Sequence, residues 1–286
     1  MLFPSLKFKV AAVQAAPVAF DLEASIRKLE RFTRTASEAG ADLVVFPEGF
    51  LSAYPWRYAF DATIGAREPR GRQWYARYHR SAVAIPSPEF DHLCSIARDH
   101  HVLLSIGIIE KERDTLYCTA ILLSRKGELL SAHRKLIPTT ALYQQGIEVY
   151  IAPNADDLPA WAASMQHIAK EGRCFVISVN QFTRVSDFPS DYPPFTAGHH
   201  DRQPDGSAWT PEAILSHGGS CIVGPLGTFI AEPVLDQEAI VYGELSRGDL
   251  VEARMDFDAV GSYSRPDVFT LTVNRKPGTN VYFSEG

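Results

Sequence analysis

Residues 41–50 read ADLVVFPEGF and place a carboxylate directly after an apolar run. The run 41–46 favours a β-strand, because branched and aromatic side chains fit a pleated, buried surface. Pro47 and Gly49 end the strand, since proline cannot donate to the ladder and glycine permits a turn. Glu48 is therefore predicted at the end of a buried strand, where it can line a pocket. Taken alone, it is more typical of a loop carboxylate that caps the next segment.

On both sides of this stretch, helical and strand patterns alternate. Asp21 is predicted to cap a helix, because the apolar residues that follow it recur at helical spacing. The other predicted helices are Glu89–His100, Trp161–Lys170 and Arg247–Asp256, and the other predicted strands are Phe8–Gln14, Val102–Ile108, Tyr117–Leu123, Glu128–His133, Cys174–Asn180, Ser220–Val223, Phe229–Ala231 and Ile240–Leu245. The stretches Leu51–Pro88 and Asp187–Pro211 are predicted loops. Several neighbouring strands have connections of hairpin length, so we expect an α/β fold of mixed sheets covered by helices.

Bulk properties indicate a single domain over residues 1–286. Hydrophobic residues make up 45% and charged residues 22%, which is ordinary for a globular protein that buries its own core. The sequence shows no internal repeat, low-complexity tract or interdomain linker. A formal net charge of −6, without a run of Lys or Arg, argues against nucleic acid and anionic membranes as partners. No apolar stretch approaches the length needed to cross a bilayer.

The cysteine pattern indicates reduced thiols without a metal. The four cysteines lie far apart and form no CxxC pair, so neither a zinc site nor any other metal site is expected: Cys94, Cys118, Cys174 and Cys221. The first residues lack the long apolar region of a secretory signal, so we expect a cytoplasmic protein. Each cysteine has apolar neighbours, and the alternation in TLYCTAILL predicts a core strand around Cys118. Buried thiols are poor nucleophiles, so none is predicted to be catalytic.

Lys135 is the second charged residue that the pattern places at a strand end. In HRKLIPT (133–139) it follows an apolar strand, where its ammonium group can stabilise negative charge that develops in a transition state. Taken alone, Arg134-Lys135 is typical of a solvated strand terminus. The decisive observation is the combination of this motif with the Glu48 motif in one chain.

Several further segments occur in the same chain and in a recognisable order. They are VVFPEGF (44–50), AYPWRY (53–58), TLYCTAILLS (115–124), HRKLIPT (133–139), GIEVYIAPNAD (146–156), HIAKEGRCFVISVNQF (167–182), HGGSCIVGPLG (217–227) and FDAVGSYSRPDVF (257–269). Together they resemble the nitrilase family of the carbon–nitrogen hydrolase superfamily. The resemblance runs from about Lys9 to Asn274, nearly the whole chain. Several matching segments in order are far more specific than a single motif.

The resemblance implies a fold, a reaction and roles for particular residues. The expected fold is a four-layer αββα sandwich, and self-association into dimers, spirals or filaments is expected. The implied reaction converts a small-molecule organic nitrile and water to a carboxylic acid and ammonia, through a cysteine thioimidate and thioester, without metal or organic cofactor. Glu48 matches the general base and Lys135 the cation that stabilises the intermediate. Tyr54, Trp56 and Asn180 match positions at or near the substrate pocket.

The chain departs from the family pattern after HRKLIPT. Family members continue with two strands and a turn that carries the nucleophilic cysteine, and only then reach the Ala-Leu-Tyr segment. Here Thr140 is followed directly by Ala141, so the nucleophile and the neighbouring strands are missing from the sequence as written. Three hypotheses follow: an ordinary nitrilase with an unwritten segment, a catalytically dead chain with a real deletion, or an assembly subunit. An amidase of the same superfamily is the alternative enzyme.

Overall fold

The computed structural model describes residues 7–56, 69–135, 140–196, 198–199, 201–261, 264, 266–268 and 270–273. Its elements are β1 (Lys7–Gln14), α1 (Leu22–Glu38), β2 (Leu43–Val45), α2 (Pro69–Arg80), β3 (Val83–Ala84), α3 (Pro88–Asp99), β4 (Leu103–Glu112), β5 (Thr115–Leu123), β6 (Leu129–Arg134), α4 (Thr140–Tyr143), β7 (Val149–Pro153), α5 (Pro159–Gly172), β8 (Phe175–Val179), β9 (Phe182–Arg184), β10 (Ile214–Val223), β11 (Phe229–Leu235), β12 (Ala239–Ser246) and α6 (Arg247–Asp256). Within these ranges, no helix combines the length and apolar character that a membrane span requires.

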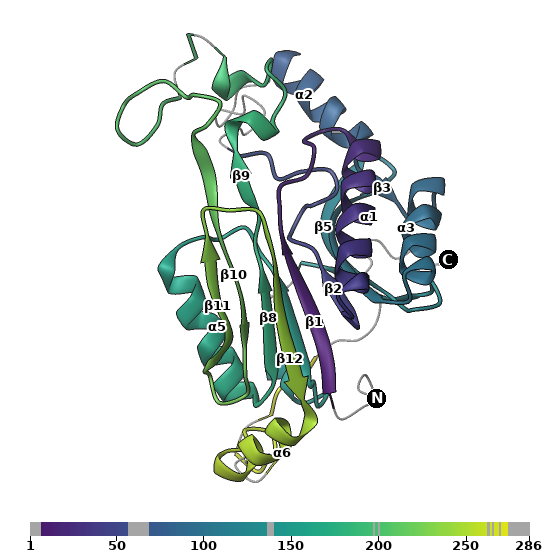
Figure 1. Cartoon of the computed structure of the whole chain (residues 1–286), viewed down its shortest axis with the longest axis vertical. Coiled ribbons are helices and arrows are strands. Elements are labelled where there is room, and N and C mark those ends of the chain that lie inside the picture. Colours follow the sequence, from purple (N-terminus) through teal and green to yellow (C-terminus); the bar gives the residue numbers. More distant parts are fainter. Residues whose placement is uncertain are drawn as a thin grey trace, which may run out of the picture.

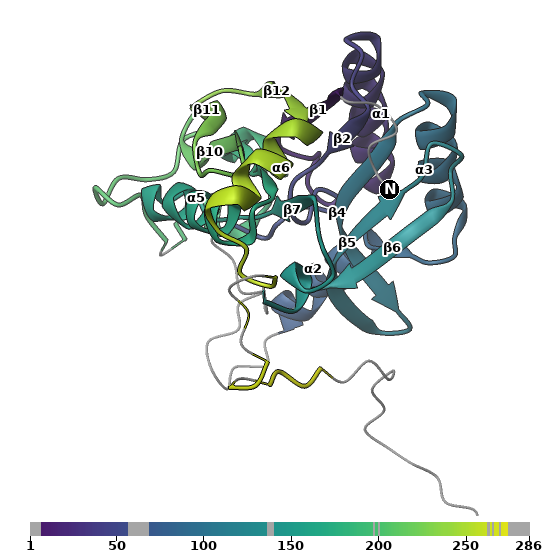
Figure 2. The same ribbon diagram turned by 90° about the horizontal axis from the view of Figure 1, so that it is seen from below.

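Two sheets form the centre of the molecule. The first has the strand order β12-β1-β2-β4-β5-β6, with β3 paired to β4, and the second has the order β11-β10-β8-β7, with β9 paired to β10. The first sheet is mixed, because β1 is antiparallel to β12 and parallel to β2. Helices α1 and α3 cover one sheet and α5 covers the other, as both views show (Figures 1 and 2). The expected α/β sandwich of the αββα type is confirmed.

Three apolar layers hold the sandwich together. The layer between α1, α3 and the first sheet includes Leu29, Leu93 and Ile106, and the layer between the two sheets includes Val10, Val45, Phe175, Ile177 and Ile222. The third layer packs α5 against the second sheet through Met165 and Ala169. Because both faces of the central strands β2, β4 and β8 are covered, these strands are buried along nearly their whole length and read as continuous apolar runs.

Local signals predicted most of the longer elements, but the helix α2 was missed, as were the short elements β3, α4, β7 and β9. Asp21 caps α1, and its carboxylate accepts a hydrogen bond from the Ala24 N–H at 2.9 Å. The stretch Leu51–Pro88 was predicted to be a loop, and that prediction was wrong for α2. The helix has a strongly polar sequence, but Trp74 and Tyr78 lie one turn apart and bury their rings against Phe20. Tertiary packing of aromatic side chains therefore overrides weak local helix propensity.

A charged network fixes the end of β6 against β4 and β5. The buried carboxylate of Glu110 accepts hydrogen bonds from Arg134 Nη2 at 2.7 Å, Arg134 Nε at 3.1 Å and Thr119 Oγ1 at 2.6 Å. The Arg134 guanidinium also lies 3.7 Å from the ring centroid of Tyr117, which adds a cation–π contact. These contacts hold β6 in register immediately before Lys135.

The turn after β2 rests directly on β4. A Cβ atom at Gly107 would lie 2.1 Å from the Pro47 carbonyl oxygen and 2.6 Å from the Glu48 Cα. Both contacts are with backbone atoms, which cannot rotate away as a flexible side chain can. Only glycine therefore permits the Glu48 turn to approach β4 this closely.

Replacing Glu110 by glutamine should make the protein less stable in a pH-dependent way. The hydrogen bonds from Arg134 outweigh burial and hold the pKa of Glu110 below its ordinary value of 4.5. A carboxyl group with a lower pKa in the folded than in the unfolded protein stabilises the fold fully at pH values above its unfolded-state pKa. This stabilisation is lost as the pH falls through the folded-state pKa. Glu110→Gln should thus lower the free energy of unfolding by about 1 kcal/mol at pH 7, a modest value because Arg134 is partly solvated.

Urea denaturation at pH 7 and at pH 4 measures this effect, and the difference from the unmodified chain should shrink at the lower pH. Glu244→Gln is the matched control, because Glu244 is exposed and pairs with Lys7 only at 3.7 Å. If Glu110→Gln lowers the free energy of unfolding equally at both pH values, the lowered pKa of Glu110 does not contribute to stability as proposed.

Replacing Gly107 by alanine should displace the turn that carries Glu48. Overpacking against backbone costs about 1–3 kcal/mol, so the urea midpoint should fall clearly. Gly248→Ala in α6 is the control, because its Cβ atom would meet only the Ser246 hydroxyl at 3.4 Å. If Gly107→Ala and Gly248→Ala both have the urea midpoint of the unmodified chain, β4 does not approach the Glu48 turn as closely as proposed.

Candidate active site

Glu48 lies in the turn that follows β2, and Gln181 holds the backbone of this turn in place. Its side chain is only 9% exposed, and its backbone carbonyl accepts a hydrogen bond from Gln181 Nε2 at 2.8 Å. Gly49 adopts a φ of 59°, a left-handed conformation that glycine reaches without steric cost. The turn therefore has a fixed backbone and directs one buried carboxylate out of the end of the first sheet.

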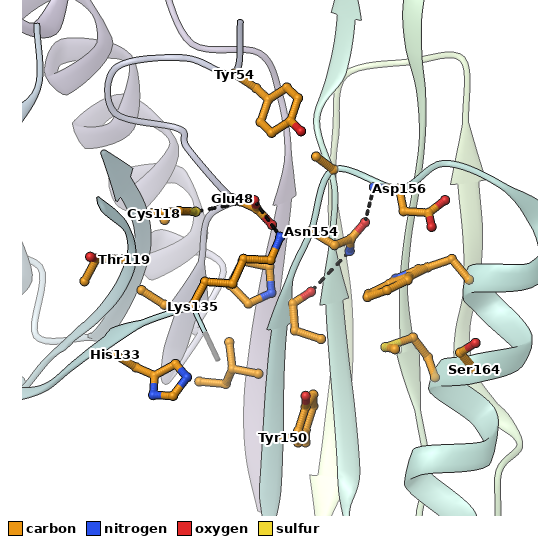
Figure 3. Close-up of a pocket in the computed structure, with 18 of the residues that line it drawn as sticks. Glu48, Tyr54, Cys118, Thr119, His133, Lys135, Tyr150, Asn154, Asp156 and Ser164 are labelled. Atoms are coloured by element: carbon orange, nitrogen blue, oxygen red, sulfur yellow. Dashed lines mark hydrogen bonds and ion pairs between the residues drawn. The ribbon is translucent and has the colours of Figure 1, made fainter. Parts of the chain in front are cut away.

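Two side chains from neighbouring strands meet this carboxylate. Lys135, one residue beyond β6, places its Nζ 3.0 Å from Oε1 and 3.0 Å from Oε2 of Glu48. Cys118 on β5 donates its thiol hydrogen to Oε1 of Glu48 at an Sγ–Oε1 distance of 3.3 Å. Figure 3 shows Glu48 between the other two side chains. The backbone couples them as well, since Lys135 N–H donates to the Cys118 carbonyl at 2.9 Å.

The proton positions of this trio follow from burial and charge. Burial opposes the charged form of Lys135, but hydrogen bonds and the charge of Glu48 outweigh it, so the pKa of Lys135 is raised. Burial, followed by the negative charge and the hydrogen bond of Glu48, raises the pKa of Cys118 to about 12, and Lys135 only partly offsets this. At neutral pH the site thus holds an ammonium group and a neutral thiol that both donate to Glu48.

A cavity of about 500 Å³ opens over the trio. Glu48, Tyr54, Cys118 and Lys135 form one wall, and the opposite wall comes from β7, the residues after it and α5: Tyr150, Ile151, Asn154, Trp161, Met165 and Ile168. Figure 3 shows Tyr54 above Glu48 and Tyr150 on the facing strand. A space of this size with mostly apolar walls and a few charged groups suits a small organic molecule. Within the described ranges, no group of three or more His, Cys, Asp or Glu is placed to hold a metal ion.

The structure brings together only some of the residues that the sequence pointed to. Glu48, Lys135 and Tyr54 line the cavity, whereas Trp56 and Asn180 are not among its described lining residues. The centroids of the Trp56 and Tyr54 rings lie 4.9 Å apart, so Trp56 packs against Tyr54 and supports it. Asn180 is fully buried, donates to the Gly218 carbonyl at 2.9 Å and lies one residue before Gln181, which holds the Glu48 turn.

Cys118 was placed in the core by the sequence, and the structure corrects this. Along β5, Thr119, Ile121 and Leu123 are buried, whereas Cys118 and Ala120 on the other face are half-buried and line the cavity. The alternation of TLYCTAILL carried this signal, because residues two apart share a face of a strand. The sequence alone does not indicate which face of β5 packs against the helices and which face lines the cavity.

Comparison with known proteins gives the family. The carbon–nitrogen hydrolase family profile matches residues 9–140 and 138–255. Nitrilase 1 of Arabidopsis thaliana is 39% identical over 98% of this chain and 90% of its own length, and an aliphatic nitrilase of Sinorhizobium fredii (strain HH103) is 40% identical over 96% of this chain and 98% of its own.

Solved structures give the same fold at much lower sequence identity. A carbon–nitrogen hydrolase from Helicobacter pylori G27 superposes with a TM-score of 0.66 at 17% identity, over 92% of this chain and 97% of its own. The NitFhit protein of C. elegans gives the same TM-score and identity, over 97% of this chain and 70% of its own. With the sequence matches, this shows that the chain belongs to the nitrilase family of carbon–nitrogen hydrolases.

Proposed function

We propose that this site hydrolyses an organic nitrile to a carboxylic acid and ammonia. The observation that carries the proposal is the Glu48–Lys135 pair, with both Nζ–O distances at 3.0 Å, at the base of a cavity of about 500 Å³. Relatives with names that include nitrilase are 35–40% identical over nearly the whole chain, which supports the same substrate class here. The chain is therefore assigned as a hydrolase of carbon–nitrogen bonds other than peptide bonds.

The two charged groups supply complementary parts of the reaction. Glu48 accepts the proton of the attacking thiol and later activates water for the two hydrolytic steps. Lys135 carries its positive charge to the nitrogen of the substrate, where negative charge develops as the nitrile bond is attacked. The apolar and aromatic wall from β7 and α5 takes the organic group of the substrate, with Tyr54 beside the reacting end. Trp56 supports Tyr54, and Asn180 lies next to Gln181, which holds the Glu48 turn.

The nucleophilic cysteine of the family is proposed to belong to a segment absent between Thr140 and Ala141. The alignment with Nitrilase 1 spans 321 positions, 35 more than the 286 residues of the chain, so at least 35 of its positions have no residue here. The two stretches that match the family profile meet at residues 138–140, which supports a break at this point. Since β6 precedes the junction and β7 follows it, an inserted segment would adjoin the cavity.

Self-association and a cytoplasmic location are proposed as well. Val251 and Met255 lie one turn apart on α6 with 69% and 89% of their surface exposed, which supports pairing of this helix with a second copy. The four cysteines are free thiols, which suits a reducing compartment. Sedimentation velocity tests the first proposal, and fractionation of cells that express the chain tests the second.

Ammonia release from phenylacetonitrile and from phenylacetamide tests the reaction itself. We expect ammonia from the nitrile and none from the amide, with the reverse result assigning an amidase. Glu48→Gln and Lys135→Met should each lower the rate by roughly a hundredfold or more, because one removes the base and the other the cation. Glu244→Gln, an exposed carboxylate far along the sequence, is the control and should leave the rate unchanged.

The intact mass of the purified protein should be measured first. A mass above the 31.7 kDa of this sequence would identify an additional segment. A folded protein of matching mass that releases ammonia from neither compound would contradict the proposed reaction and favour an assembly subunit.

A further inference from the structure

One reactive group at the site has no part in the proposed reaction. The Cys118 thiol lies on the cavity wall, 3.3 Å from the carboxylate that serves as the proposed base. The same carboxylate holds the Lys135 ammonium group at 3.0 Å. A thiol, a base that accepts its proton and a cation for the developing charge therefore meet in one cavity of the chain as written.

We propose that Cys118 is a nucleophile of this chain and adds to the nitrile carbon of a substrate in the cavity. The inference rests on the proposed function for the substrate class but not for the identity of the thiol. It assigns the covalent step to β5, which is present, rather than to the segment that is absent.

The step balances without any further reactant. The Cys118 Sγ–C bond forms as one π bond of the nitrile breaks, the thiol proton passes to Glu48, and the substrate nitrogen receives a proton from Glu48 or Lys135. The product is a thioimidate on Cys118 with neither oxidation nor reduction. One water then releases ammonia and leaves a thioester, and a second water releases the acid and restores the thiol.

Position distinguishes Cys118 from the other thiols. Cys174 and Cys221 are fully buried in the layer between α5 and the second sheet. Cys94 lies on α3 and is not among the residues that line the cavity. Among the four, Cys118 alone combines access to the cavity with a hydrogen bond to a carboxylate in the described part of the chain.

The alternative is that Cys118 merely satisfies Glu48 as a neutral hydrogen-bond donor. The two roles predict opposite effects of Glu48→Gln on thiol reactivity. As a mere neighbour, the carboxylate disfavours the thiolate through its negative charge, so its neutralisation should accelerate alkylation. As a base, it removes the proton during attack, so its loss should slow alkylation.

The rate of alkylation by iodoacetamide at pH 7.5 (roughly physiological, where an ordinary thiol is mostly protonated) decides between these roles. Peptide mapping by mass spectrometry follows Cys118 and Cys94 in the same molecule, so Cys94 is an internal control. We expect Glu48→Gln to slow the labelling of Cys118 by about tenfold or more and to leave Cys94 unchanged. The inference would be overturned if Cys118 is not labelled in the native chain. It would also be overturned if Glu48→Gln leaves the rate of Cys118 labelling unchanged or raises it.

The nitrile step is tested by intact mass after incubation with phenylacetonitrile. We expect one added nitrile, mapped to Cys118, in the unmodified chain and in Cys94→Ala, and none in Cys118→Ala. Cys118→Ser keeps a hydrogen-bond donor for Glu48, and circular dichroism of both Cys118 variants establishes whether they fold. If the native chain shows neither an adduct on Cys118 nor an ammonia release that Cys118→Ala abolishes, the inference is overturned.

The outcomes separate this inference from the proposed function. An adduct on Cys118 without release of ammonia supports the thiol assignment and contradicts turnover. Equal ammonia release by Cys118→Ala and the unmodified chain overturns the thiol assignment and leaves nitrile hydrolysis standing.

Discussion

The carboxylate of Glu48 is the group on which the arrangement of the site depends. It is almost fully buried, and a buried charge is costly unless a partner of opposite charge and further hydrogen bonds compensate it. Lys135 supplies the charge and Cys118 a further donor, so one side chain ties the β2 turn to β5 and to the end of β6. The turn after β2 is thereby fixed to the consecutive strands β5 and β6, which lie far from it in sequence.

This arrangement requires precise support from residues other than the three that meet at the carboxylate. Gly107 lets β4 approach the turn, and Gln181 reaches from the second sheet to hold the Glu48 carbonyl at 2.8 Å. Glu110 grips Arg134, the neighbour of Lys135, through two hydrogen bonds. The position of the carboxylate is thus set by contacts from both sheets.

Sequence reasoning reached the fold and the charged pair but not the whole site. Strand ends, the Asp21 cap and helix periodicity are local properties, so the order of elements and the place of Glu48 could be predicted. Helix α2 could not, because its stability comes from Trp74 and Tyr78 packing against Phe20, which is distant in sequence. Cys118 was misplaced for a related reason: a strand buried on one face and facing a cavity on the other looks the same in sequence as a core strand.

The junction at Thr140–Ala141 separates the structural role of the charged pair from its chemical role. Removing the Lys135 charge would leave the Glu48 carboxylate buried without its cation, so the pair contributes to a folded site whether or not a reaction occurs there. The pair therefore has a structural role that is independent of its proposed chemical role. In the described part of the chain, β6 and β7 are the edge strands of their sheets and leave the cavity between them open. Burial of the Glu48 carboxylate requires a hydrogen-bond donor beside it, and a hydroxyl group could fill that place as well as a thiol. The presence of a sulfur atom at this position is therefore what favours a chemical role for Cys118.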